Sequence, residues 1–351
     1  MKPIKLHIKT ENQKYPIIIG NNILGKLQKL LKKNLINFNK CLVVVDKNVP
    51  KKLINKAIGS LPNKKVFLHY YNANEKNKNQ RSIDKILHIL LSKNFNRNDC
   101  LISIGGGITG DVSGFASSMF KRGLKFINIP TTLLAQVDSS IGGKTGINSK
   151  YGKNLIGAFY PPSLVISDTN FLRSLSRREL ICGYGEILKH ALIAGKKFFL
   201  FLSKNGSKIL NLRNPLIEKA IFKSCSIKKK IVEADEKEIN IRKILNFGHT
   251  FAHAYEATLG YSKRLNHGEA VILGIKTAIN FSLANKILNI KDFNLIENHL
   301  NKLRLPKNIN KLFSIKNLNR ILSFMKKDKK NNTNKINLVL LKKIGSPVYK
   351  L

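Results

Sequence analysis

The sequence predicts an α/β protein: an N-terminal Rossmann-like domain with a parallel sheet, followed by an all-α C-terminal domain. Up to about residue 165, short β-branched runs alternate with helical patterns, which is typical of a parallel sheet covered by helices on both faces. After about residue 170 the β-rich runs nearly vanish, and long stretches with helical spacing replace them. We therefore expect an α/β domain at residues 1–168 and a helical domain at residues 169–351.

The individual elements follow from the spacing of apolar residues. Six short, nearly continuous apolar runs predict buried strands, at 17–19, 42–45, 65–68, 101–104, 126–129 and 164–166. Residues 83–92 carry apolar side chains at helical spacing, and the second half predicts helices at 176–195, 214–236, 248–259, 268–287 and 291–303. A late run at 336–340 is either a strand or a buried extended segment.

The charge of the chain is strongly basic. Its 351 residues include 63 Lys and Arg against 20 Asp and Glu, which gives a formal net charge of +43. Only eleven of the basic residues are Arg, whereas proteins that grip phosphates or base edges rely on Arg. Scattered Lys therefore favours a solvated basic surface and no nucleic-acid partner, with a basic nucleic-acid-binding protein as the alternative from another class. A hydrophobic content of 43% excludes a wholly disordered chain.

The cysteines and the N-terminus bear on the compartment. Four cysteines, at 41, 100, 182 and 225, lie far apart without a C-x-x-C pair, which fits a reducing compartment and excludes a disulfide scaffold. The first residues contain no apolar signal region, and no window resembles a membrane span. We expect a cytoplasmic protein without a membrane partner.

A glycine-rich turn follows the expected strand at 101–104. Residues 105–111 read Gly-Gly-Gly-Ile-Thr-Gly-Asp, so that Gly105, Gly107 and Gly110 satisfy G-x-G-x-x-G between a strand and a helix. Such a turn lets the backbone approach a pyrophosphate at a helix N-terminus, although the same pattern also occurs in plain tight connections. Asp46, at the end of another expected strand, could face a ribose or could equally be a turn or N-cap residue.

The segment 130–146 combines hydroxyls and glycines with Asp138 and Lys144. Its small residues bury little area, which predicts an anion-binding loop rather than a packing element. The phosphate-loop spacing fails, so an ATPase is disfavoured. Lys153 and Asn154 add a second cation and an amide a few residues later.

The helical half carries a candidate metal site. Glu186 and Lys189 lie three residues apart on one expected helix, His249 and His253 lie one turn apart on another, and His267 opens a third. Two histidines and a carboxylate are a frequent ligand set for a catalytic divalent metal, most often zinc. A surface ion pair remains the alternative for Glu186 and Lys189. The metalloprotease pattern H-E-x-x-H is absent.

In this order the motifs resemble the 3-dehydroquinate synthases of the sugar phosphate cyclase superfamily. The signatures are residues 105–111, 130–146, 152–161, 245–253 and 267–270. The resemblance implies a phosphorus–oxygen lyase of the shikimate pathway, which leads to chorismate and the aromatic amino acids. It would convert 3-deoxy-D-arabino-heptulosonate 7-phosphate to 3-dehydroquinate and phosphate. The implied steps are transient oxidation by NAD, phosphate elimination, re-reduction and intramolecular aldol closure.

The resemblance also implies roles for individual residues. It makes residues 1–168 the NAD-binding domain and residues 169–351 the metal- and substrate-binding domain. One Zn²⁺ or Co²⁺ would be held by Glu186, His249 and His267. NAD would contact Asp46, Asn48, Glu75, Lys78, Gly105, Gly106, Gly107, Ile108, Thr109, Asp111, Thr131, Thr132, Lys144, Lys153, Phe171 and Ser174. The sugar-acid phosphate would contact Asp138, Lys144, Asn154, Lys189, Lys228, Arg242, Asn246, His253 and Lys329. Arg122 would reach the phosphate site of a neighbouring subunit, which implies a homodimer.

Some positions depart from the pattern of the family. The sequence Asn72-Ala73-Asn74 stands before Glu75 where a glycine-containing turn is common. The nearest alternatives are another sugar phosphate cyclase, forming a valiolone or a deoxy-inosose, and a metal-dependent polyol dehydrogenase. The cyclases would differ in the substrate pocket rather than in the metal ligands.

Overall fold

The computed structural model describes residues 2–11, 14–326 and 336–350, which fold into two compact units. Unit 1 contains the chain up to Ser176 together with Val232–Lys237. Unit 2 contains Arg177–Ile231 and the chain from Glu238 onward. The boundary expected after residue 168 precedes this division, because the turn η4 (Thr169–Ser174) directly follows the last strand of the main sheet and belongs to unit 1.

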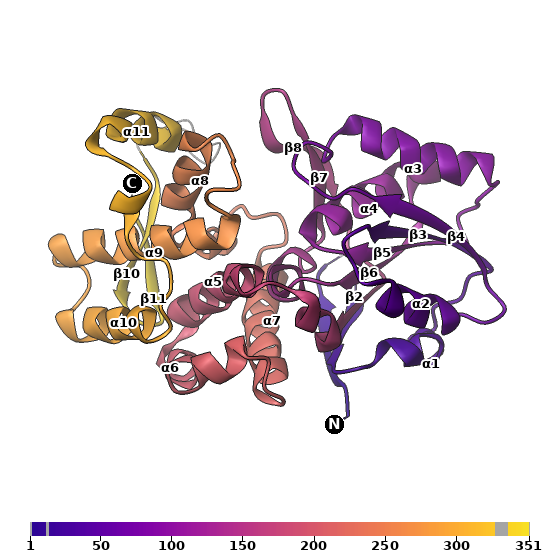
Figure 1. The fold of residues 1–351 in the computed structure, drawn as a ribbon, viewed down its shortest axis with the longest axis horizontal. Coiled ribbons are helices and arrows are strands. Elements are labelled where there is room, and N and C mark those ends of the chain that lie inside the picture. Colours follow the sequence, from indigo (N-terminus) through magenta and orange to yellow (C-terminus); the bar gives the residue numbers. More distant parts are fainter. Residues whose placement is uncertain (1, 12–13, 327–335, 351) are drawn as a thin grey trace. The chain divides into compact units, whose positions relative to one another are not determined.

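Unit 1 is built on a seven-stranded sheet with the order β1-β2-β9-β6-β5-β3-β4 (Figure 1). All six expected strands are present, and all neighbouring pairs are parallel except β1 with β2. The strands are β1 (Ile4–Lys9), β2 (Lys14–Gly20), β3 (Lys40–Asp46), β4 (Lys65–Tyr71), β5 (Cys100–Gly105), β6 (Lys125–Pro130) and β9 (Leu164–Asp168). The edge strand β1, which we did not expect, alternates exposed and less exposed residues and therefore lacks a continuous apolar run.

Helices cover both faces of this sheet, as the alternation predicted. Val43 of β3 packs in one core with α1 (Leu27–Lys33) and α2 (Lys51–Gly59). Its neighbour Val44 points the other way, into a second core with α3 (Gln80–Ser92) and α4 (Gly107–Met119). The short 3₁₀ helices η1 (Leu24–Lys26) and η2 (Phe120–Arg122) complete this part of unit 1.

The strand order reverses between β3 and β5. From β3 the chain crosses to β4 at the sheet edge, whereas from β5 it crosses to β6 on the other side. In open parallel sheets, ligands bind beyond the carboxyl ends of the strands at such a switch point. Asp46 ends β3 and Gly105 ends β5, so the two residues lie on either side of it.

The segment expected to be an anion-binding loop is more ordered and more buried than we predicted. It contains the short π-helix η3 (Ala135–Ser139) and leads into the antiparallel hairpin β7 (Lys144–Ser149) and β8 (Gly152–Phe159). Gln136 is fully buried, and its Nε2 donates hydrogen bonds to the carbonyls of Pro130 and Asp168. Packing therefore explains part of this segment, contrary to our prediction.

Unit 2 is helical. Its elements are α5 (Arg177–Ala194), α6 (Lys196–Leu210), α7 (Leu216–Ala234, with its end in unit 1), η5 (Ile241–Asn246), α8 (His249–Thr258), α9 (His267–Ala284), α10 (Ile290–Lys302), η6 (Ile309–Lys311), η7 (Ile315–Asn317), α11 (Leu318–Lys326), β10 (Leu338–Lys343) and β11 (Ser346–Lys350). All five expected helices are present; α6 and α11 were not expected. The hairpin β10–β11 shows that the unit is not strictly all-α, and that the late apolar run forms a strand from Leu338.

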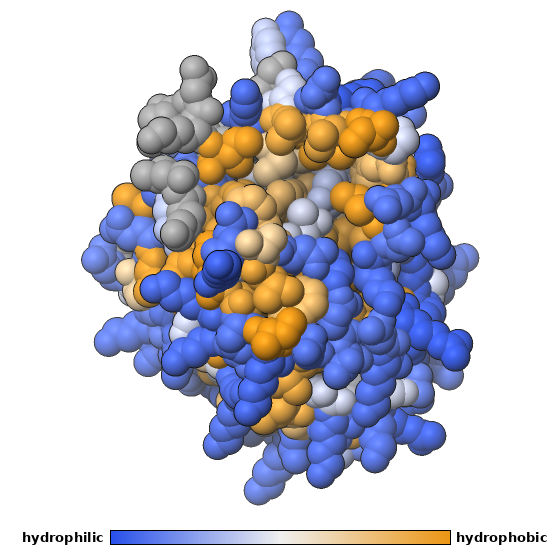
Figure 2. All heavy atoms as spheres, turned by 90° about the vertical axis from the view of Figure 1, so that its left-hand side faces the viewer, coloured by the Kyte–Doolittle hydropathy of each residue, from blue (hydrophilic) through white to orange (hydrophobic). Residues whose placement is uncertain are grey.

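The surface shown in Figure 2 has many hydrophilic side chains around areas of hydrophobic ones. The four cysteines form no disulfide with one another. No helix in the described part of the chain has the length and apolar character needed to cross a membrane.

Candidate active site

Three helices of unit 2 bring Glu186, His249 and His267 together. Glu186 lies in the middle of α5, whereas each histidine is the first residue of its helix. The turn before α8 depends on Gly248, whose φ of 78° is in the left-handed region that favours glycine. Before α9, Asn266 and Glu269 form a reciprocal capping box that fixes where the helix begins.

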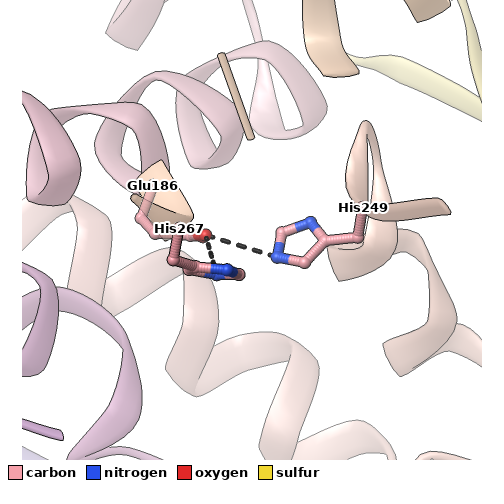
Figure 3. A group of neighbouring side chains, drawn as sticks. All are labelled: Glu186, His249 and His267. Atoms are coloured by element: carbon pink, nitrogen blue, oxygen red, sulfur yellow. Dashed lines mark ion pairs between the residues drawn. The ribbon is translucent and has the colours of Figure 1, made fainter. Parts of the chain in front are cut away.

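The three side chains point toward one another (Figure 3). Oε1 of Glu186 lies 3.3 Å from Nε2 of His249 and 3.6 Å from Nε2 of His267. One ligand atom from each residue lies within 4.8 Å of the other two. A tetrahedral zinc ion with ligand distances of about 2.0–2.2 Å separates its donors by roughly 3.4 Å. The two measured separations therefore fit a metal held by these residues.

The Glu186 carboxylate is fully buried, and its two oxygens have different neighbours. Oε2 forms an ion pair with Lys189, which is also buried, whereas Oε1 faces the two imidazoles. Glu186 and Lys189 do form an ion pair, but the hypothesis that this pair lies at the surface is wrong. Within the described residues, neither oxygen receives a hydrogen bond of good geometry, so these contacts are electrostatic. A buried carboxylate oxygen in this state is suited to bind a cation.

Charges in the cluster set its ionisation. Burial alone would raise the pKa of the Glu186 carboxyl, but Lys189 and His249 hold this pKa well below its usual value. Burial, together with the charge of Lys189, lowers the pKa of His249 to about 4, so that this ring is neutral near pH 7. Burial opposes protonation of His267, yet the carboxylates of Glu256 and Glu186 raise the pKa of His267 well above its usual value.

Glu256 is a member of this cluster that the sequence analysis missed. Its Oε2 lies 3.0 Å from Nδ1 of His267, and His253, Glu256 and His267 form a second group with ligand atoms within 4.8 Å. The rings of His253 and His267 stack with centroids 6.2 Å apart. The spacing of positions 249, 253 and 256 places one face of α8 toward this cluster, a signal that could have identified Glu256.

Unit 2 also contains further residues expected to contact the substrate. Lys228 of α7 and Arg242 of η5 are buried cations, 6% and 2% exposed. Asn246 donates a hydrogen bond from Nδ2 to Oε1 of Glu238 at 3.0 Å, a partner that we did not predict. Lys329 lies outside the described residues.

In unit 1 the glycine-rich turn joins β5 to the N-terminus of α4. Gly106 is the N-cap residue, and no side chain caps this helix among the described residues, which leaves its first N–H groups suited to an anion. A Cβ at Gly107 would lie 3.0 Å from Oγ of Ser139, and one at Gly106 would lie 3.2 Å from Cγ2 of Thr132. A side chain at either position would crowd a neighbouring residue, and glycine keeps the backbone of the turn open to the close approach that a dinucleotide site requires.

Two lysines of unit 1 form ion pairs with other residues that were predicted to contact NAD. Lys78 is 4% exposed, pairs with Asp111 in α4 and donates to Oδ1 of Asn154 at 2.6 Å. Lys153 pairs with Glu75 at 3.1 Å, and Asn148, which we did not predict, donates to Glu75 at 2.7 Å. The structure therefore brings four of the predicted nucleotide residues into two neighbouring pairs despite the unusual sequence before Glu75.

The remaining predicted residues of unit 1 differ in their burial and in the partners that they contact. Oδ1 of Asp46 accepts from the backbone N–H and the Nδ2 of Asn48, both at 3.0 Å, which makes Asp46 a turn residue. The side chains of Thr109 and Phe171 are fully buried, so a cofactor contact there would have to use their backbone. Ser174 donates to the Phe171 carbonyl at 2.7 Å. Ile108, Thr131, Thr132, Asp138 and Lys144 lie along the α4 N-terminus and the segment from β6 to β7, and Arg122 is exposed in η2.

Comparison with known proteins assigns this chain to a family. Residues 69–182 match the family model of the 3-dehydroquinate synthase N-terminal domain, and residues 183–331 match that of the C-terminal domain. A 3-dehydroquinate synthase of Pelagibacter ubique (strain HTCC1062) is 72% identical over 348 residues, covering 99% of this chain and 95% of its own. The chain belongs to the 3-dehydroquinate synthase family.

Other members of this family and a solved cyclase agree with that assignment. The 3-dehydroquinate synthase of Bartonella tribocorum (strain CIP 105476 / IBS 506) is 40% identical, covering 96% of this chain and 92% of its own. A crystal structure of 2-deoxy-scyllo-inosose synthase, complexed with carbaglucose-6-phosphate, NAD⁺ and Co²⁺, superposes with a TM-score of 0.88 at 25% identity. It covers 98% of this chain and 94% of its own. The predicted family is confirmed, and so is the predicted fold class apart from the hairpin β10–β11 in the helical unit.

Proposed function

We propose that this chain catalyses the 3-dehydroquinate synthase reaction, the conversion of 3-deoxy-D-arabino-heptulosonate 7-phosphate to 3-dehydroquinate and phosphate. The observation that carries the proposal is the cluster of Glu186, His249 and His267 around a fully buried carboxylate, in a chain that is 72% identical to a relative named for this activity. A cluster of this kind fits a catalytic divalent metal better than a structural role, because two histidines and one carboxylate leave a coordination position open.

NAD and one divalent metal, Zn²⁺ or Co²⁺, are the proposed cofactors. When bound, NAD takes up and returns a hydride, and the metal acidifies the substrate hydroxyl that is oxidised. Support comes from the donor set in unit 2 and from the related cyclase, whose structure contains NAD⁺ and Co²⁺. In unit 1, the uncapped N-terminus of α4 at the switch point would bind the pyrophosphate.

The chain's own residues have separable tasks in this proposal. Glu186, His249 and His267 hold the metal, and Lys189 keeps the Glu186 carboxylate ionised and oriented through its other oxygen. The substrate carries a carboxylate and a phosphate, for which the buried cations Lys228 and Arg242 are suitable partners. Asn246 and His253 orient the substrate, and together such contacts hold the reacting groups in a productive geometry.

The test is release of phosphate from the heptulosonate phosphate, measured with and without NAD and a chelator. We expect release that requires NAD and is lost with the chelator. Glu186→Gln should abolish it, whereas Glu179→Gln, an exposed position on the same helix, should retain it. Release that needs neither NAD nor metal, or a fully active Glu186→Gln protein, would contradict the proposal.

Another cyclase activity is the competing outcome. The structural similarity to 2-deoxy-scyllo-inosose synthase makes a hexose 6-phosphate the substrate to test beside the heptulosonate phosphate. NAD-dependent phosphate release from glucose 6-phosphate alone would favour that activity instead. The 72% identity to a 3-dehydroquinate synthase supports the heptulosonate phosphate.

We also propose that the protein is a homodimer in which Arg122 acts on the neighbouring subunit. Lys121 and Arg122 have φ values of 47° and 64°, a strained backbone that projects an exposed guanidinium. Strand β8 exposes the apolar side chains of Leu155, Ile156 and Phe159, and Leu155 and Phe159, four residues apart, share a face that a second copy could cover. Mixing inactive Arg122→Ala and Glu186→Gln proteins should restore activity if Arg122 acts in trans. A monomeric mass in solution, or no restoration after exchange of subunits, would contradict this arrangement.

A further inference from the structure

The imidazole of His267 connects two carboxylates of unit 2. Its Nε2 lies 3.6 Å from Oε1 of Glu186, and its Nδ1 lies 3.0 Å from Oε2 of Glu256. Glu256 is on α8, is 7% exposed and lies eleven residues before His267. An ionised carboxylate accepts hydrogen bonds and cannot donate them. The contact with Glu256 therefore requires a proton on Nδ1 of His267.

We propose that Glu256 is a positioning residue, which holds His267 with its proton on Nδ1 and the lone pair of Nε2 directed at the divalent metal. This inference rests on the proposed function, because it assumes that a metal is bound by Glu186, His249 and His267. Histidines that bind metals generally donate their other ring N–H to a carboxylate or a backbone carbonyl, which fixes the tautomer and the ring orientation.

His249 provides an internal comparison. Its Nε2 faces Glu186, and its Nδ1 lies 3.3 Å from the backbone carbonyl of Phe247. Both rings therefore present Nε2 to Glu186 and Nδ1 to an oxygen acceptor. The acceptor at His249 belongs to the backbone and cannot be removed by substitution, whereas the acceptor at His267 is a side chain. The role of this kind of contact can therefore be measured at Glu256.

A second metal ion is the competing explanation for Glu256. His253, Glu256 and His267 each offer a ligand atom within 4.8 Å of the others. Binding there would require Nδ1 of His267 to lose its proton and its hydrogen bond to Glu256. A single ring would then bridge two cations, which repel each other. We therefore assign Glu256 to orientation, and metal stoichiometry separates the two explanations.

The experiment titrates the metal-free full-length protein with Co²⁺ and follows visible absorption and the dissociation constant. Glu256→Gln keeps an oxygen acceptor but loses the charge, and Glu256→Ala loses both. We expect one Co²⁺ per wild-type chain, a Co²⁺ dissociation constant about 10–100-fold higher for the Ala variant, and a smaller increase for the Gln variant. The absorption bands of bound Co²⁺ should shift in the Ala variant, because the orientation of a ligand changes.

The matched control is Asp292→Asn, which alters another buried carboxylate of unit 2. Asp292 accepts from the backbone N–H of Ile344 at 3.0 Å and pairs with Lys196. This control should lower thermal stability without changing Co²⁺ affinity or absorption. The inference would be overturned if Glu256→Ala bound Co²⁺ with the affinity and absorption of the wild type, or if the wild-type chain bound two Co²⁺. Either result would leave the proposed function intact. No Co²⁺ binding by the wild-type chain would instead contradict the proposed function. If Glu256→Ala does not fold, Glu256→Gln decides the question.

Discussion

The backbone N–H of Gly268 donates to Sγ of Cys182 at 3.2 Å, and this contact joins the beginning of α9 to α5. A Cβ at position 268 would collide with the backbone of Cys182. Glu186 lies one turn along α5 from Cys182, and His267 immediately precedes Gly268. The close approach of the two helices therefore sets the distance between two proposed metal ligands.

Gly268→Ala should separate α9 from α5 and weaken metal binding. Overpacking costs about 1–3 kcal/mol in a well-packed interior, and here the obstacle is backbone, which yields less than a side chain. We expect a lower melting temperature and a higher Co²⁺ dissociation constant. The control is Gly59→Ala in α2, where an added Cβ meets nothing within 4 Å. Unchanged Co²⁺ affinity in Gly268→Ala would show that the helix spacing does not control the site.

Lys189→Met should destabilise the metal-free protein more than the metal-bound protein. The substitution leaves the buried Glu186 carboxylate without its lysine, and removal of one partner of a buried pair costs about 3–5 kcal/mol. A bound Zn²⁺ restores positive charge beside the same carboxylate. Adding Zn²⁺ should therefore raise the melting temperature of Lys189→Met more than that of the wild type. Lys196→Met, which breaks a partly exposed pair with Asp292, should show the wild-type Zn²⁺ shift. Equal shifts for Lys189→Met and wild type would contradict this explanation.

Much of unit 1 was predictable because buried parallel strands form continuous apolar runs. β3 and β5 are buried on both faces, whereas β1 and β8 each leave a face or an edge exposed and so lack this signal. The hairpin of β7 and β8 was also hidden by glycines and hydroxyls, which suggested a loop.

The site was predictable only where its residues lie in motifs. His249 and His267 each open a helix, next to a glycine that sequence can indicate. The partnership of Glu256 with His267 depends on the packing of α8 against α9, and that of Lys78 with Asp111 joins residues 33 positions apart. The spacing on α8 indicates that Glu256 faces the cluster, but no local pattern determines which side chain Glu256 or Lys78 contacts. These contacts follow from tertiary packing, which one sequence does not specify residue by residue.

Lys78→Met should weaken NAD binding. The lysine is buried and pairs with Asp111 in the first turns of α4, so its loss leaves a carboxylate near the proposed pyrophosphate site. Repulsion between that carboxylate and the dinucleotide should raise the NAD dissociation constant about tenfold or more, corresponding to roughly 1.4 kcal/mol. Calorimetric titration with NAD measures this effect. The control is Lys40→Met. Lys40 pairs with Asp99 and is the first residue of β3, at the end of the strand opposite to Asp46, so this variant should bind NAD normally. Equal loss in both variants would indicate general damage to unit 1.

His299→Gln should remove part of the acid sensitivity of folding. Burial, together with the charge of Lys302, lowers the pKa of His299 to about 4, and its Nε2 lies 3.0 Å from the hydroxyl of Tyr184. In the unfolded chain this pKa returns to about 6.5, so between pH 6.5 and 4 the unfolded state binds the extra proton and stability falls as pH decreases. Between pH 7 and pH 5, the titration of His299 should lower the free energy of unfolding of the wild type by about 2 kcal/mol. The total decrease for His299→Gln should therefore be smaller than that of the wild type by the same amount. Urea unfolding at both pH values, with a chelator present throughout, measures the difference. His88→Gln, at an exposed position on α3, is the matched control. If His299→Gln shows the same loss as the wild type, the histidine is not held neutral by its burial.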